Sequence, residues 1–162
     1  MEQQDILGGK RILVVDDEHD VLDTVEDLLS MCEVTTASDF GRARGLLEAQ
    51  TFDLALLDIM GVDGYGLLEL AVDKGIPAVM LTAHALSLEN ITKSRKMGAS
   101  YFIPKEEMAH LPTFLRDIFE ARAKGKNPWA RWYERLAAFC ERRFGPDWKD
   151  ADKAFWDRLT FY

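Results

Sequence analysis

The sequence predicts an α/β fold, a doubly wound five-stranded parallel sheet with helices on both faces, followed by an α-helical C-terminal extension. Short apolar runs alternate with helix-like stretches five times within residues 1–120. These runs are continuously apolar, which is typical of parallel strands buried on both faces. All four tryptophans lie after residue 128, where the alternation has ended. Repeated βα units favour a parallel sheet with right-handed crossovers.

The predicted strands are the apolar runs. Arg11–Asp16 has four apolar positions, three of them β-branched. Leu54–Asp58 and Ala78–Thr82 have the same character, and Val34–Ala37 and Tyr101–Pro104 are weaker candidates. We therefore expect five strands in the first part of the chain.

The predicted helices lie between these runs. Apolar residues recur at spacings of three and four over Val21–Met31, and Asp20 is a candidate cap for that helix. Further helices are predicted over Asp39–Ala49, Gly64–Val72, Leu88–Met97 and Thr113–Ala121. The helix over Asp39–Ala49 is expected to begin at a capping Asp39 or at the preceding Ser38, while Gly75 and Gly98 are stop signals.

Charge and composition exclude several classes of protein. Residues 1–120 carry 22 acidic and 10 basic side chains, a net −12, whereas residues 121–162 carry 6 acidic and 10 basic, a net +4. An acidic first part argues against a general nucleic-acid surface. Cys32 and Cys140 lack metal-ligand spacing and are expected to be reduced thiols. Met1–Lys10 lacks the apolar core of a signal peptide, so we expect a soluble, cytoplasmic protein with no membrane span.

Polar side chains end four of the five predicted strands. They are Asp16-Asp17-Glu18, Asp58, Thr82 and Lys105. Because ligands of such sheets bind outside the carboxyl ends of the strands, we expect these groups to converge. Clustered carboxylates repel one another without a cation, and an oxygen-rich site with open positions suits Mg²⁺. A carboxylate there can attack a phosphoryl group, with Lys105 neutralising its oxygens and Thr82 donating a hydrogen bond.

Four segments together resemble the receiver domain of two-component response regulators. They are Ile12-Leu13-Val14-Val15-Asp16-Asp17-Glu18, Leu56-Leu57-Asp58, Val79-Met80-Leu81-Thr82-Ala83 and Gly98-Ala99-Ser100-Tyr101-Phe102-Ile103-Pro104-Lys105. Their order and spacing fit the family, and the resemblance covers residues 9–122. Residues 123–162 do not resemble a receiver and form a separate, aromatic-rich helical extension.

The resemblance implies a flavodoxin-like strand order 2-1-3-4-5 and a role for each motif residue. Asp58 matches the phosphoacceptor and Lys105 the lysine that pairs with the phosphoryl group. Asp17 matches the acidic residue that binds Mg²⁺ directly, and Asp16 matches its partner, which acts largely through water. Asp58 itself and the backbone carbonyl of Met60 complete the implied set of Mg²⁺ ligands. Thr82 matches the switch hydroxyl and Phe102 the switch aromatic, although an aromatic residue in a strand is commonly plain core.

The sequence departs from the family pattern after the phosphoacceptor. The family usually has Met-Pro-x-Met-Asp-Gly there, whereas Asp58 is followed by Ile59-Met60-Gly61-Val62-Asp63-Gly64. The loop is about two residues short and lacks the proline, so Gly61 and Gly64 are expected to adopt unusual dihedrals. Asp63 is predicted to cap the next helix.

Two further departures concern the lysine and the histidines. Glu106, not proline, follows Lys105, so a trans bond is expected, and Pro112 is expected to start the next helix. His19 and His110 read as surface or helix-end residues, while His84, two residues after Thr82, borders the predicted site.

The tail is predicted to be helical after Asn127-Pro128 and to break at Gly145-Pro146. Its first helix places large apolar residues on one face: Trp129, Trp132, Tyr133, Leu136, Phe139, Cys140 and Phe144. A second stretch carries Trp148, Ala151, Phe155 and Leu159, with Trp156 and Phe161 nearby. Such stripes are usually packing surfaces, and the opposite charges favour docking on the fourth and fifth helices and the fifth strand, in the same chain or in a second copy.

These observations favour a single-receiver response regulator that accepts a phosphoryl group from a histidine kinase or a phosphotransfer protein. We expect it to catalyse only its own phosphorylation and dephosphorylation. Its output is expected to be a contact with an unidentified protein or the formation of a homodimer. The alternative is a transcriptional regulator whose short C-terminal helices bind DNA, which the lack of a basic recognition face disfavours. A degenerate receiver acting as a scaffold is a weaker alternative, because the site residues are intact.

Overall fold

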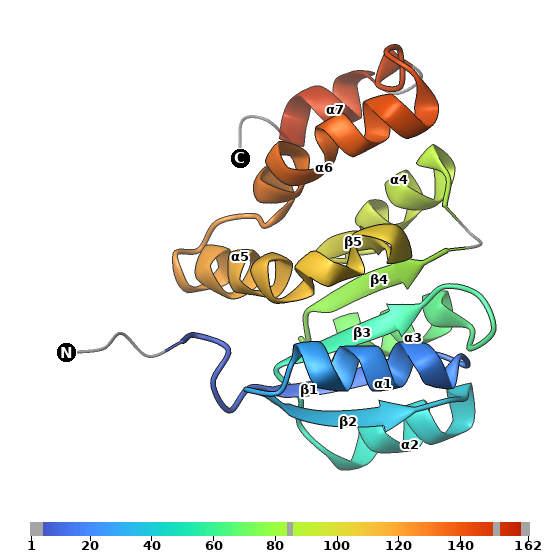
Figure 1. Cartoon of the computed structure of the whole chain (residues 1–162), viewed down its shortest axis with the longest axis vertical. Helices are drawn as coiled ribbons and strands as arrows, with labels where there is room; N and C mark the ends of the chain where they lie inside the picture. Colours follow the sequence, from blue (N-terminus) through green and yellow to red (C-terminus); the bar gives the residue numbers. More distant parts are fainter. Residues whose placement is uncertain (1–4, 84–85, 151–152, 160–162) are drawn as a thin grey trace.

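The computed structural model describes residues 5–83, 86–150 and 153–159. A single five-stranded parallel sheet has the order β2-β1-β3-β4-β5 (Figure 1). The strands are β1 Arg11–Val15, β2 Glu33–Ala37, β3 Leu54–Asp58, β4 Ala78–Thr82 and β5 Tyr101–Pro104. The predicted α/β class, strand positions and strand order are confirmed.

The helices flank the sheet and extend beyond it. They are α1 His19–Leu28, α2 Phe40–Ala49, α3 Gly64–Asp73, α4 Leu88–Lys96, the 3₁₀ helix η1 Lys105–His110, α5 Leu111–Ala123, α6 Trp129–Phe144 and α7 Lys153–Leu159. Helices α1 and α5 pack together on one face of the sheet, while α2 and α3 pack together on the other (Figure 1). Within the described residues, no helix is both long and apolar enough to cross a membrane.

Helix starts follow the predicted caps in one case and not in another. Asp39 caps α2 by accepting a hydrogen bond from the Arg42 N–H at 2.8 Å. The prediction that Asp20 caps α1 is wrong, because the helix begins at His19, with Glu18 at the cap position and no side-chain cap. Asp20 instead lies in the first turn, where its negative charge interacts favourably with the helix dipole.

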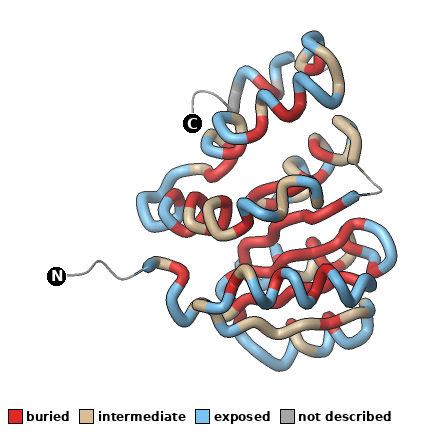
Figure 2. Tube along the Cα trace, in the orientation of Figure 1, coloured by how far each residue is buried: buried red, intermediate tan, exposed pale blue. Residues whose placement is uncertain are grey.

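Burial explains why the strands read as continuous apolar runs. Every residue of β3 and β4 is buried, as are four of the five residues of β1. Helices cover both faces of these strands, so their residues are buried except Arg11 at the start of β1 (Figure 2). The outer strand β2 is only partly buried, which matches its weaker sequence signal.

The tail docks on the α/β domain through two buried indoles. Trp129 and Trp132 are each 1% exposed, and their Nε1–H groups donate to the carbonyl oxygens of Ala99 and Phe102, both at 2.7 Å. Of the two alternatives left open, docking in the same chain or on a second copy, the structure shows the first, and the contact lies beside β5 as predicted (Figure 1). Each buried indole N–H has found a partner, which fixes α6 in one register.

An ion pair adds a second anchor between α6 and α5. Asp117 of α5 is 3% exposed and accepts from Arg135 Nε at 2.9 Å and Nη2 at 3.2 Å. Arg131 Nη1 lies 3.7 Å from the same carboxylate. A buried carboxylate is costly without such partners, so this contact is specific to the docked tail.

The ends of α6 match the predicted signals. The Asn127 side chain accepts from the Trp129 N–H at 3.0 Å, and Gly145 ends the helix with φ of +93°. The two remaining tryptophans attach the next segment to α6. Trp156 stacks on Trp132 with centroids 5.7 Å apart, and Trp148 meets Trp156 edge-on at 4.8 Å. Ala151 and Phe161, also predicted for this stripe, lie outside the described residues.

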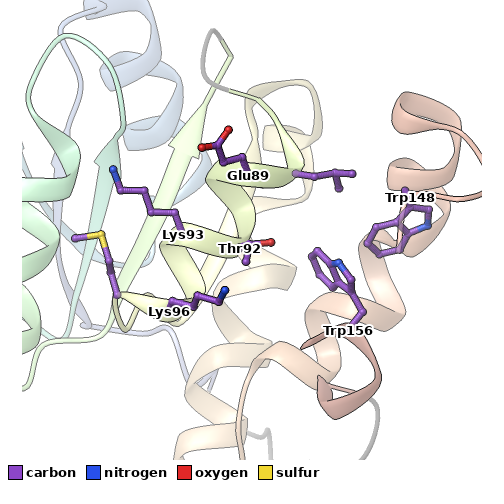
Figure 3. A pocket seen from close by; sticks show the side chains of 8 residues that line it. Glu89, Thr92, Lys93, Lys96, Trp148 and Trp156 are labelled. Atoms are coloured by element: carbon purple, nitrogen blue, oxygen red, sulfur yellow. The ribbon is translucent and has the colours of Figure 1, made fainter. Parts of the chain in front are cut away.

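The tail does not close completely over α4. A pocket of about 570 Å³ lies between α4 and the side that carries Trp148 and Trp156. On α4, the side chains of Thr92 and Lys96 point toward Trp156, whereas those of Glu89 and Lys93 point away from the tryptophans (Figure 3). The tail is therefore anchored mainly on β5 and α5, and part of α4 remains open to solvent.

Candidate phosphoacceptor and metal site

The strand ends bring two buried carboxylates to one edge of the sheet. Asp16 follows β1 and is fully buried, and its Oδ1 accepts from the Glu18 N–H at 2.9 Å. Asp58 is the last residue of β3 and is 4% exposed. Parallel pairing of β1 with β3 places both at the carboxyl edge, as predicted.

Lys105 joins these carboxylates. Its Nζ lies 2.9 Å from Asp16 Oδ2, 3.6 Å from Asp58 Oδ1 and 3.5 Å from Glu18 Oε1. It directly follows β5, and its side chain is 10% exposed. Thr82, 1% exposed, ends β4 between β3 and β5, and its register partner Pro104 directly precedes Lys105. The structure thus gathers the four predicted strand ends.

Burial shifts the protonation of these groups. Burial, and then the nearby charge of Asp16, raises the pKa of Asp58 to about 7. Burial also raises the pKa of Asp16, despite its hydrogen bonds from Glu18 and Lys105. Burial lowers the pKa of Lys105, but the contact with Asp16 and the charges of Asp16, Asp58 and Glu18 together outweigh that effect and raise its pKa. A cation beside these carboxylates would favour their ionised forms.

The donor set fits a hard divalent cation. Carboxylate oxygens of Asp16, Asp17 and Glu18 all lie within 4.8 Å of one another. Oxygen donors alone, with two of the three residues exposed and open to water, suit Mg²⁺. Sequence reasoning did not count Glu18 among the ligand candidates, although the Asp-Asp-Glu run contained the signal.

The short loop after Asp58 folds tightly onto the site. Met60 is 54% exposed, while Ile59 and Val62 on either side of the loop centre are buried. Asp63 adopts φ of +50° and caps α3 by accepting from the Gly66 N–H at 3.2 Å, as predicted. A Cβ on Gly64 would overlap the backbone carbonyl oxygen of Asp58, so only glycine fits there. The role of the Met60 carbonyl as a ligand stays a prediction.

The predicted switch aromatic is built into the tail contact. Phe102 is fully buried, and its carbonyl oxygen is the acceptor for Trp132. Its neighbour Tyr101 packs between Phe114 and Trp129, with ring centroids 5.5 and 6.5 Å away. Sequence reasoning gave Tyr101 no role at this contact.

The remaining expectations around the site can be placed. Every peptide bond in the described part of the chain is trans, including Lys105–Glu106, and η1 carries the chain from there into α5. That helix starts at Leu111, next to the predicted Pro112. His19 and His110 are exposed, whereas His84 lies outside the described residues.

A comparison of the sequence with models of known protein families identifies the family of this chain. A family model for the response regulator receiver domain matches residues 12–116. The chain belongs to the response regulator receiver family. Receiver domains bind Mg²⁺ at an acidic cluster and are generally not enzymes in the ordinary sense, and response regulators interact with histidine kinases or phosphotransfer proteins.

Named relatives are longer than this chain. It is 38% identical over 120 residues to the probable transcriptional regulator ycf27 of Cyanophora paradoxa, covering 68% of this chain and 50% of the relative. It is 31% identical over 137 residues to the regulatory protein VanRc of Enterococcus gallinarum, covering 78% and 59%. The chain thus spans about half the length of these relatives.

Solved receiver structures share the fold. A CheY-like receiver domain protein from Methanospirillum hungatei JF-1 is 32% identical with a TM-score of 0.62, covering 72% of this chain and 99% of that one. The receiver domain of NtrX from Brucella abortus is also 32% identical, with a TM-score of 0.58, covering 64% and 92%. This chain therefore covers almost the whole of both solved receiver domains.

Proposed function

We propose that this chain is a phosphorylation switch in which Asp58 accepts a phosphoryl group, with Mg²⁺, from a histidine kinase or a phosphotransfer protein. The observation that carries the proposal is the Lys105 ammonium, held 2.9 Å from Asp16 and 3.6 Å from Asp58 at the carboxyl edge of the sheet. A buried cation beside two buried carboxylates is a ready site for an anionic phosphoryl group.

The proposed reaction needs little beyond positioning and charge neutralisation. An ionised Asp58 oxygen forms a bond to phosphorus, the bond from phosphorus to the donor nitrogen or oxygen breaks, and the donor keeps that electron pair. Lys105 pairs with the phosphoryl oxygens, and Thr82 donates a hydrogen bond to one of them. Mg²⁺, held by Asp16, Asp17, Asp58 and the Met60 carbonyl, would neutralise further oxygen charge.

The proposed output is a protein contact controlled through the tail. Lys105 and Thr82 lie at the ends of β5 and β4, and both would change partners when a phosphoryl group arrives. Trp132 hydrogen-bonds to Phe102 within the same strand β5. A shift at the end of β5 therefore alters how firmly α6 is held, which biases the docked state against the released state.

DNA binding is the second candidate, favoured by the name of ycf27 as a probable transcriptional regulator. The tail argues for the protein contact instead. The aromatic face of α6 is buried on the receiver, and its exposed side mixes basic Arg142 and Arg143 with acidic Glu134 and Glu141. Duplex binding with an affinity that falls steeply with salt would favour the second candidate.

The test uses acetyl phosphate and Mg²⁺ with intact-mass measurement. We expect one added phosphoryl group on the wild-type chain and none on Asp58→Asn. Asp73→Asn, an exposed carboxylate at the end of α3, is the matched control and should be modified like the wild type. A normal yield with Asp58→Asn would refute the assignment.

A further inference from the structure

Gly61 contacts the Asp17 carboxylate directly. A Cβ built on Gly61 would lie 2.5 Å from Asp17 Oδ2, 2.7 Å from Cγ and 2.8 Å from Oδ1. Distances this short leave no room for a side chain unless the carboxylate moves. The backbone of Gly61 also has φ of +85°, a conformation that favours glycine. The Cα of Gly61, which carries no side chain, is therefore in van der Waals contact with the Asp17 carboxylate.

Asp17 has no other evident restraint. It is exposed, and among the described residues its carboxylate takes part in no hydrogen bond and no ion pair. Asp16, in contrast, is fixed by the Glu18 N–H and by Lys105. Yet a carboxylate oxygen of Asp17 lies within 4.8 Å of those of Asp16 and Glu18. The contact with Gly61 is thus what defines its place in the cluster.

The loop cannot easily yield to a larger residue at position 61. Ile59 and Val62 are 6% and 2% exposed and hold the loop in the core on both sides of Gly61. Gly64 packs against the Asp58 backbone at the start of α3. Because the loop is held at these points, the exposed Asp17 side chain is the partner that must move.

We propose that Gly61 is a positioning residue of the metal site, whose bare Cα holds the Asp17 carboxylate beside Asp16 and Glu18 for binding a divalent cation. This inference rests on the proposed function, because it places the cation at Asp16 and Asp17, two of the carboxylates to which that proposal assigns Mg²⁺, and adds Glu18 beside them. The shortened loop then has a purpose, since it brings a glycine against the ligand that nothing else restrains. Support for a ligand from outside the coordination sphere commonly changes metal affinity about 10–100-fold.

The test compares Gly61→Ala with two alanine substitutions of the same backbone class. Gly75 and Gly125 have φ of +72° and +67°, and a Cβ on either meets nothing within 4 Å. Calorimetric titration of the full chain with Mg²⁺ gives the affinity, and thermal unfolding without metal gives the stability. We expect all three variants to lose melting temperature through backbone strain. Only Gly61→Ala should bind Mg²⁺ at least about ten-fold more weakly.

An Asp17→Ala background separates positioning from general damage. If Gly61 acts through Asp17, adding Gly61→Ala to Asp17→Ala should weaken Mg²⁺ binding no further. Wild-type affinity in Gly61→Ala, or an equal further loss in the Asp17→Ala background, would overturn the positioning role while leaving the phosphoacceptor proposal intact. A wild-type chain that binds no Mg²⁺ would instead overturn the proposed function, and with it the metal role of Gly61.

Discussion

At the scale of single residues, the site holds two buried carboxylates, Asp16 and Asp58, whose charges favour the binding of a cation beside them. Sequence reasoning could find Asp16, Asp58, Thr82 and Lys105, because parallel strands must end at the same edge of the sheet. It could not find how close Glu18 comes to Lys105, at 3.5 Å, because that depends on where α1 begins.

The raised pKa of Asp58, about 7 against an ordinary 3.8, predicts a pH-dependent cost. Because the pKa of Asp58 is higher in the folded state than in the unfolded state, the folded chain keeps its full free energy of unfolding below pH 4. Part of that free energy is lost as the pH rises through 7. Asp58→Asn removes this cost, so without metal it should be more stable than the wild type at pH 8 by roughly 4 kcal/mol, and little different at pH 4. Urea unfolding in EDTA at both pH values checks this, and a less stable variant at pH 8 would contradict it.

Met60 predicts the lifetime of the phosphorylated state. It is 54% exposed two residues after Asp58, and a thioether side chain cannot orient an attacking water. The phosphorylated Met60→Asn variant should therefore lose its phosphoryl group several-fold faster. That is less than the ~100-fold or more that a positioned acid–base group commonly contributes. Mass spectrometry after removal of the donor gives the decay rate. Val72→Asn is the control, because Val72 is the other exposed large apolar residue in the described part of the chain, and equal decay in the two variants would show the reasoning wrong.

At the scale of elements, the docking of α6 rests on contacts that periodicity cannot reveal. The stripe of Trp129, Trp132 and Leu136 predicted a buried face, and the structure confirms it. The partner of Arg135 could not be predicted, because Asp117 reads in the sequence as an ordinary helix charge. Only the approach of α5 and α6 makes it a buried acceptor.

Asp117→Asn should weaken the tail contact. The substitution keeps the size of the side chain but leaves Arg135 and Arg131 without their anionic partner. Both arginines are partly exposed and can turn to water, so we expect a loss of about 2 kcal/mol, below the cost of breaking a fully buried pair. Tryptophan fluorescence during urea unfolding reports it, since all four tryptophans lie in the tail. Asp27→Asn on the exposed side of α1 is the control, and an equal change in both variants would count against the ion pair.

At the scale of the whole molecule, a receiver carrying −12 and a tail carrying +4 form a single hydrophobic core. The sequence was sufficient for the five strands and the docking face, because burial on both faces and opposite charge leave clear patterns. The starts of α1 and α5 and the turn η1 were less predictable. Polar first turns and a 3₁₀ segment have no apolar period of their own.

Phosphorylation of the site should change the environment of the tryptophans in the tail. Acetyl phosphate with Mg²⁺ is expected to change tryptophan fluorescence in the wild-type chain, because Trp132 is bonded to the strand that precedes Lys105. Asp58→Asn should show no change under the same conditions. Full phosphorylation with an unaltered spectrum would mean that the tail does not respond to the site and that output arises elsewhere on the receiver.

The central claim is that Asp58 carries the phosphoryl group, and its most direct test is chemical mapping of the modified residue. Borohydride reduces an acyl phosphate to an alcohol, so an aspartyl phosphate becomes homoserine in the digested chain. After treatment with acetyl phosphate and Mg²⁺, we expect homoserine at position 58 and at no other aspartate. Homoserine at a different aspartate, or at none in a sample whose intact mass shows the added group, would contradict the account.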